Sequence, residues 1–222
     1  MIVPSMTKDE LVKELSLDKD WVDGRVYGID QKYKKKIMKV RGHEVLAVTN
    51  YTTPRNNFVT VVWRATYVDR RTTILTAVPY FRYMTVRGYQ YIMLMCHGKH
   101  SYTPLIYTSH CIDRMKERIG MDFRQYIIQS EAQDNGGMFM DDYVYNGKQT
   151  KGLVFPNYGM FILDEATWGY AAVTFISKEQ QGDVQNEITS EYERQRHMYN
   201  LRYENNIREQ IRKNESGIFN LV

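Results

Sequence analysis

The first clear pattern in the chain is helical. Thr7, followed three residues later by Glu10, matches a capping box, in which each side chain bonds to the other residue's backbone. Leucine and valine then recur on one side of the following turns, as the core face of an amphipathic helix requires. This pattern predicts a helix over residues 7–17.

From Asn57 to Cys96 the apolar residues take the period of strands. Three runs follow one another, "FVTVVWRATYV", "TILTAVPYFRYMTV" and "GYQYIMLMC", with turn-forming residues between them. In the first run every second residue is apolar, at Val59, Val61, Trp63, Ala65 and Tyr67. The three runs predict an antiparallel meander. Pro79 should lie at an edge or a bulge, because proline cannot donate a ladder hydrogen bond.

Two helices are predicted after this meander, over residues 109–119 and 121–132, with Gly120 between them. Four more strands then run from "MFMDDYVY" to "YAAVTFIS". In their first turn, Asn146 and Gly147 give a strong hairpin signal because both tolerate positive φ. The predicted fold class is α+β, with antiparallel sheet and two short central helices.

The last part of the chain, from Asp183 to Asn214, is highly polar and predicts a long C-terminal helix. Its apolar residues form a thin stripe, mostly at steps of four: Val184, Ile188, Tyr192, Tyr199, Tyr203, Ile207 and Ile211. So narrow a stripe predicts one-sided docking, either on the body of the protein or, through residues 184–213, on a protein partner or a second copy. The chain is thus expected to have an N-terminal helix and meander (1–105), a helix-helix-meander region (106–178) and a C-terminal helical extension (179–222).

Composition adds limits to this picture. Among 222 residues, 18 Tyr, 8 Phe and 3 Trp favour β-structure, and a net charge of +4 permits a polyanionic partner. No apolar run approaches the ~18 residues that span a bilayer, and the start "MIVPSMTKDE" lacks the pattern of a secretory signal. Two cysteines cannot form a disulfide framework. We therefore expect a cytoplasmic protein, of a cell or of an infected host, without a membrane partner.

The helix over residues 109–119 carries the candidate chemistry. Its apolar residues, Cys111, Ile112, Met115 and Ile119, cluster on one side. Four polar residues share an edge away from that side: His110, Arg114, Glu117 and Arg118. Cleavage of RNA through its own 2′-hydroxyl needs a base, an acid and fixed positive charge at the phosphate. Histidine can be acid or base near neutral pH, and arginine can clamp a phosphate with two parallel bonds. A solvated helix face with routine charge pairs is the alternative.

The order of elements also resembles the barnase-like and RelE-like ribonuclease toxins over residues 107–177. The resemblance rests on a first helix reading His-x-x-x-Arg-x-x-x-Arg, here His110, Arg114 and Arg118, and on a last strand with the pair Val173-Thr174. It implies a metal-independent endoribonuclease that needs no cofactor, with His110 and Arg114 as the best matched positions. A second catalytic partner on the sheet would come from Tyr158, Tyr170, Lys151 or Thr174.

A run of basic residues precedes the first meander and is a second candidate site. A phosphate backbone could bind Lys34, Lys35, Lys36, Lys39 and Arg41, while Tyr33 stacks on a base. The alternative is an edge strand that uses lysine to deter aggregation.

A zinc site is a further possibility, because Cys96, His97, His100, His110 and Cys111 lie close in sequence. However, no C-x-x-C or H-x-x-x-H pair occurs, and the cysteines also suit a core, so no metal is expected. Two functions remain open. One is an endoribonuclease of toxin type or an inactive RNA-binding relative. The other is a non-enzymatic assembly protein of phage or mobile-element origin.

Overall fold

The computed structural model describes residues 1–68, 72–96, 102–132, 138–145, 147–155 and 157–182, with Asn186, Ser190, Glu191, Arg194 and Met198 beyond them. The helices are α1 (Lys8–Asp23), α2 (Val26–Ile37), α3 (Ser109–Ile119) and α4 (Phe123–Ala132), with a short 3₁₀ turn at Lys178–Gln180. The strands are β1 (His43–Thr52), β2 (Phe58–Tyr67), β3 (Thr73–Thr85), β4 (Gly88–Cys96), β5 (Tyr102–Tyr107), β6 (Met138–Tyr145), β7 (Lys148–Phe155), β8 (Gly159–Ala166) and β9 (Gly169–Ser177).

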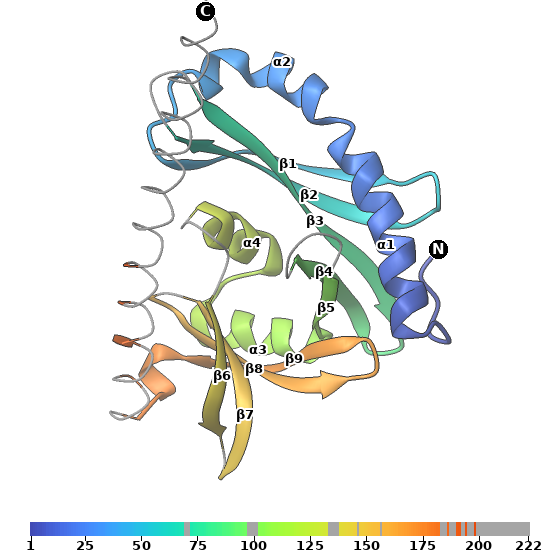
Figure 1. Cartoon of the computed structure of the whole chain (residues 1–222). Coiled ribbons are helices and arrows are strands. Elements are labelled where there is room, and N and C mark those ends of the chain that lie inside the picture. Colours follow the sequence, from blue (N-terminus) through green and yellow to red (C-terminus); the bar gives the residue numbers. More distant parts are fainter. Residues whose placement is uncertain are drawn as a thin grey trace, which may run out of the picture.

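All described strands belong to one sheet of nine, in the order β1-β2-β3-β4-β5-β9-β8-β7-β6 (Figure 1). Both predicted meanders are confirmed, and each is antiparallel. A parallel pair, β5 with β9, joins them, with Leu105 opposite Tyr170. The sheet therefore crosses the boundary proposed near residue 105, and the three-part division stays a prediction.

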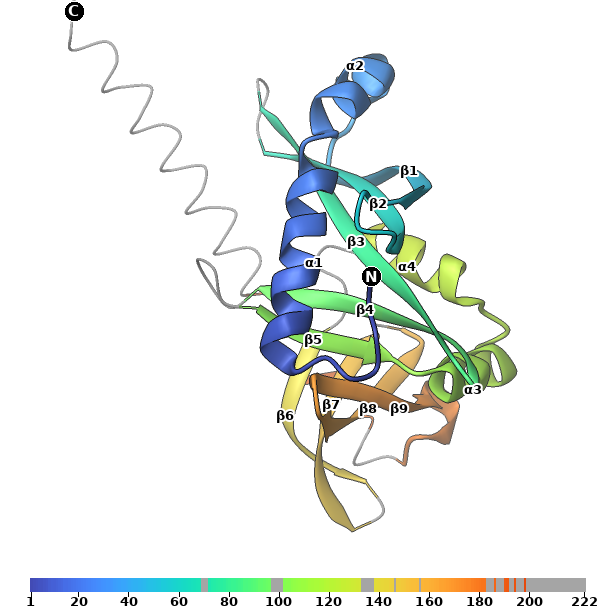
Figure 2. The ribbon, with the colours of Figure 1, turned by 90° about the vertical axis from the view of Figure 1, so that its right-hand side faces the viewer.

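Two layers of helix cover opposite faces of this sheet. On one face, α1 runs across β3 to β5 and α2 continues over β1 and β3 (Figure 2). On the other face, α3 and α4 lie between the β1–β3 part of the sheet and the β6–β9 part (Figure 1). The α+β class is thus confirmed, including the two central helices.

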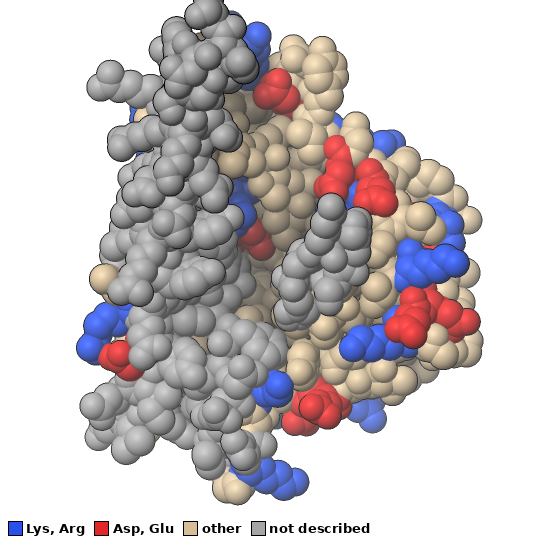
Figure 3. All heavy atoms as spheres, in the orientation of Figure 1, with Lys and Arg blue, Asp and Glu red and all other residues tan. Residues whose placement is uncertain are grey.

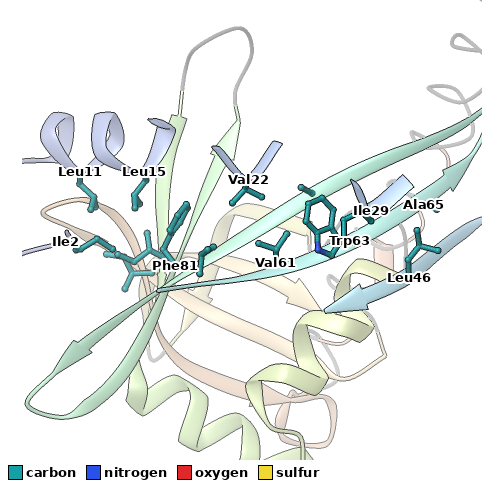
Figure 4. Close-up of a cluster of buried hydrophobic side chains, with 14 of the residues drawn as sticks. Ile2, Leu11, Leu15, Val22, Ile29, Leu46, Val61, Trp63, Ala65 and Phe81 are labelled. Carbon is teal, nitrogen blue, oxygen red and sulfur yellow. The ribbon is translucent and has the colours of Figure 1, made fainter. Parts of the chain in front are cut away.

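Strand β2 is buried on both sides because helices cover both faces there. Val61 and Trp63, whose period of two was predicted, pack under Leu11, Leu15 and Val22 of α1 (Figure 4). The intervening residue Val62 is equally buried but belongs to the core beneath α3 and α4. The alternation therefore separates two apolar cores rather than a core from solvent.

Tertiary contacts correct the sequence analysis at the N-terminal end. The first helix continues to Asp23, because Val22 adds a further buried turn beyond the predicted end. The lysine run lies on the second helix, α2, and not on an edge strand, so the edge-strand interpretation is wrong. Pro79 lies opposite Val61 of β2, in a stretch of β3 that pairs with β4 only from Phe81 onward. The predicted C-terminal helix falls almost entirely outside the described residues.

A cluster of three largely buried polar side chains links α4 to strands β2 and β3. Tyr80 Oη donates to Glu131 Oε1 at 2.7 Å, and Arg64 Nη1 lies 3.3 Å from Glu131 Oε2. Burial raises the pKa of the Glu131 carboxyl, which Arg64 and Tyr80 oppose. The group joins β2, β3 and α4 at the centre of the molecule.

A second polar network ties α1 to the loop between β1 and β2. Arg55 Nε donates to Glu14 Oε2 at 2.7 Å. Asn57 Nδ2 donates to Glu14 Oε1 at 3.1 Å and to Asp18 Oδ2 at 2.6 Å. Thr53 Oγ1 donates to Asp18 Oδ2 at 2.9 Å. Both carboxylates are buried, so the loop supplies the hydrogen bonds that water would otherwise provide.

This network predicts a loss of stability in acid. The hydrogen bond from Arg55 lowers the pKa of Glu14 from 4.5 to about 2. A lowered folded-state pKa adds stability above the unfolded-state value, and that stability is lost as pH falls from about 4.5 towards 2. We expect Glu14→Gln to remove this part of the pH dependence, measured as urea midpoints across that range. Equal acid sensitivity of both proteins would contradict the assignment to Glu14.

Candidate nucleic-acid interface

Helix α3 begins and ends on strand β9. Thr108 caps its first turn, accepting from the backbone N–H of Cys111 at 3.2 Å. The Thr108 hydroxyl also donates to the carbonyl of Ala172 at 2.7 Å, and Arg118 donates to the carbonyl of Phe175. The parallel pairing of β5 with β9 stops at Ala172. Helix α3 therefore continues along β9 where β5 ends, and its side chains bond to carbonyls of that edge.

The predicted row of four residues is present on α3, but its members have different roles. His110 and Glu117 are exposed, and Arg114 is partly exposed. Arg114 Nη1 lies 2.9 Å from Glu117 Oε2, an exposed pair three residues apart. Arg118 is turned to the sheet by its bond to Phe175. The row therefore offers one imidazole, one paired guanidinium and one guanidinium already bonded to backbone.

The sheet residues considered as catalytic partners make contacts of their own. Lys151 Nζ donates to Tyr170 Oη at 3.0 Å, between β7 and β9. The ring of Tyr158 stacks on Phe155, with centroids 4.5 Å apart. Thr174 lies opposite Ile162, beside the register shift that leaves Val173 without a partner in β8. The structure thus brings Lys151 to Tyr170 between β7 and β9, and Arg114 to Glu117 within α3.

Cys111, one of the residues weighed for zinc, lies in the core. It is fully buried, and burial raises the pKa of its thiol to about 12, so the thiolate that binds metal is disfavoured. His97, His100 and the side chain of Cys96 fall outside the described residues. Among the described residues, no three His, Cys, Asp or Glu side chains gather as a metal ligand set.

The basic residues predicted to bind RNA are all exposed, on or just after α2. Ile29 and Ile37 hold α2 to the sheet, which turns the rest of its circumference outward. The lysines fall in the last turn and beyond, where the helix dipole favours positive charge.

Two of the five basic residues have partners within the protein. Lys36 Nζ lies 2.8 Å from Glu44 Oε1. Arg41 Nη1 donates to the carbonyls of Met38 and Val40 at 3.1 and 2.8 Å. The side chains of the remaining three, Lys34, Lys35 and Lys39, have no hydrogen bond or ion pair in the described part of the chain.

Elsewhere the charges are mixed. On the face shown in Figure 3, the blue and red side chains of the described residues lie interspersed, with acidic groups beside basic ones. Opposite charges so close together cancel much of the long-range field. Lys34, Lys35 and Lys39 instead lie within six residues of one another, with no acidic residue between them.

The different roles of the two arginines on α3 can be tested by stability. Arg118→Met removes a bond to a backbone carbonyl and should lower the free energy of unfolding by about 1–2 kcal/mol. Arg114→Met removes an exposed pair and should change it by less than about 0.5 kcal/mol. Chemical denaturation of both variants measures this. Equal effects would show that Arg118 is as weakly held as Arg114.

Among the described helices, none is both long enough and apolar enough to cross a membrane. Comparisons with protein-family models, with curated proteins and with solved structures find no match for this chain, so its function is argued from its own residues.

Proposed function

We propose that this protein binds RNA through the exposed lysines of α2, without cleaving it. The observation that carries the proposal is the set of three cations, Lys34, Lys35 and Lys39, that no carboxylate of the described chain neutralises. Phosphate groups release condensed counterions when lysines replace them, which makes such a surface favourable for a polyanion. The rigid attachment of α2 through Ile29 and Ile37 keeps these lysines together.

The contacts of α3 favour binding over cleavage. A phosphate clamp needs guanidinium donors that are free to turn to the substrate, but Arg118 bonds to the carbonyl of Phe175. In the described part of the chain the His110 side chain has no hydrogen bond or ion pair, so no neighbouring group orients its imidazole as acid-base catalysis usually requires. The protein is therefore proposed to bind RNA but not to cleave it.

The test uses purified full-length protein and labelled single-stranded RNA in EDTA. We expect the RNA to shift into a complex and to be recovered intact, from both the unchanged protein and His110→Ala. Cleavage by the unchanged protein that His110→Ala abolishes would replace the proposal with the ribonuclease function. Failure to form a complex at low salt would reject RNA binding and favour the assembly function.

A further inference from the structure

An exposed group of aromatic rings around one arginine lies where β2, β3 and β4 meet. Arg82 of β3 is opposite Phe58 on β2, and opposite Tyr91 on β4. Its guanidinium carbon lies 4.9 Å from the centroid of the Phe58 ring and 4.6 Å from that of the Tyr89 ring. We call Phe58, Arg82 and Tyr89 the aromatic platform.

The platform is open to solvent yet held in place. Phe58 is 52% exposed and Tyr89 is 47% exposed, although both lie on strands. Beside them Tyr91 stacks on Phe123 at the start of α4, with centroids 4.1 Å apart and planes 22° apart. The rings therefore present faces on a supported surface, rather than on a free loop.

The charge of Arg82 indicates which kind of partner the platform would bind. Within the described residues no carboxylate pairs with it, so its positive charge stays at the surface between the rings. A partner that stacks on an aromatic ring and also carries negative charge satisfies both features. Single-stranded RNA offers a flat base and a phosphate in each nucleotide, and base stacking on aromatic side chains accepts every base.

A lipid surface or a protein partner suits this geometry less well. Membrane insertion favours apolar side chains that project outward, whereas these rings lie against a cation. A protein hot spot would require burial of the unpaired guanidinium, unless the partner supplied an acidic group. The platform and the α2 lysines lie on opposite faces of the sheet, because the platform shares the α4 side with Tyr91, whereas Ile29 and Ile37 hold α2 to the other side.

We propose that the aromatic platform stacks bases of the single-stranded RNA whose phosphates the α2 lysines bind. This inference rests on the proposed function, and it adds base contact to a purely electrostatic site. The two surfaces contact different parts of the RNA: the lysines bind its phosphates, and the platform stacks on its bases. An RNA that reaches both surfaces has to pass around the edge strand β1.

The test compares two polyanions by calorimetry, using the full-length protein. One is an oligouridylate long enough to pass around β1, and the other is inorganic polyphosphate, which has charge but no bases. We expect Phe58→Ala and Tyr89→Ala each to weaken RNA binding by roughly tenfold, the order expected for loss of one stacked base. Binding of polyphosphate should stay within about twofold, because it depends on charge alone.

Matched variants separate stacking from stability. Tyr89→Phe keeps the ring and should keep RNA affinity, and Arg82→Lys keeps the charge but loses the planar stack, so it should weaken RNA binding alone. Ile74→Ala removes a comparably exposed apolar side chain from the same strand as Arg82 and should change neither affinity.

Each contrary outcome identifies what has failed. RNA affinity that survives Phe58→Ala and Tyr89→Ala would overturn the platform and leave the proposed function standing. Equal losses for RNA and polyphosphate would also overturn it, since the rings would then act through folding or charge. No RNA binding by the unchanged protein would overturn both proposals, and tight binding of anionic vesicles in its place would assign the platform to lipid.

Discussion

Gly169→Ala should disrupt the packing between the two halves of the sheet and strongly destabilise the protein. Gly169 begins β9 with φ of +148°, where an L side chain is strained. A Cβ there would also collide with the backbone carbonyl of Pro104 on β5, and would lie 3.2 Å from Thr103 Cγ2. Backbone strain and overpacking together should cost roughly 3 kcal/mol or more in free energy of unfolding. Thermal and urea denaturation measure the loss.

Gly28→Ala is the matched control. Gly28 lies in α2, and a Cβ there would meet nothing within 4 Å. Alanine should therefore stabilise the helix by about 0.5–1 kcal/mol, because it loses less conformational entropy on folding. A Gly169→Ala protein as stable as the unchanged one would contradict the close approach of β9 to β5.

Replacing the three unpaired lysines with glutamine should have the largest effect on function. For single strands, each phosphate neutralised adds about 0.7 to the slope of log affinity against log salt concentration, so Lys34→Gln/Lys35→Gln/Lys39→Gln should reduce that slope by about 2. Affinity at moderate salt should fall by at least roughly tenfold. Fluorescence anisotropy with labelled RNA over a salt series gives both quantities.

The control for this variant keeps the change in net charge and moves it elsewhere. Lys8, Lys13 and Lys148 are exposed residues outside α2, and their triple replacement by glutamine also removes three charges. We expect its salt slope to stay close to that of the unchanged protein. Similar losses in both triple variants would mean that overall charge, and not the surface of α2, attracts the RNA.

Local patterns in the sequence predict much of the fold. The strand period in "FVTVVWRATYV" and the capping box of Thr7 and Glu10 each depend on residues close in sequence, and both predictions are confirmed. The helical state of the lysine run was missed, although Val26, Ile29, Tyr33 and Ile37 recur at the steps of three and four that a helix requires. Ile29 and Ile37 supply the contacts with the sheet that stabilise this helix.

The arrangement of candidate site residues depends on contacts between distant segments. The parallel pairing of Leu105 with Tyr170 is set by how two meanders pack, and no local period encodes it. The same packing brings Arg118 to the carbonyl of Phe175. Arg118 therefore bonds to the sheet, although it lies on the same helix edge as His110. The aromatic platform was missed for a related reason, since register alone sets Phe58 beside Arg82.

Contact between RNA and the surface of α2 can be measured by photo-cross-linking. Full-length protein bound to RNA containing a photoreactive uridine analogue would be irradiated and digested, and the cross-linked peptides identified by mass spectrometry. We expect cross-links in peptides from α2 and from the segment after it, up to Arg41. Cross-links confined to α3 around His110, with none in those peptides, would contradict binding at α2.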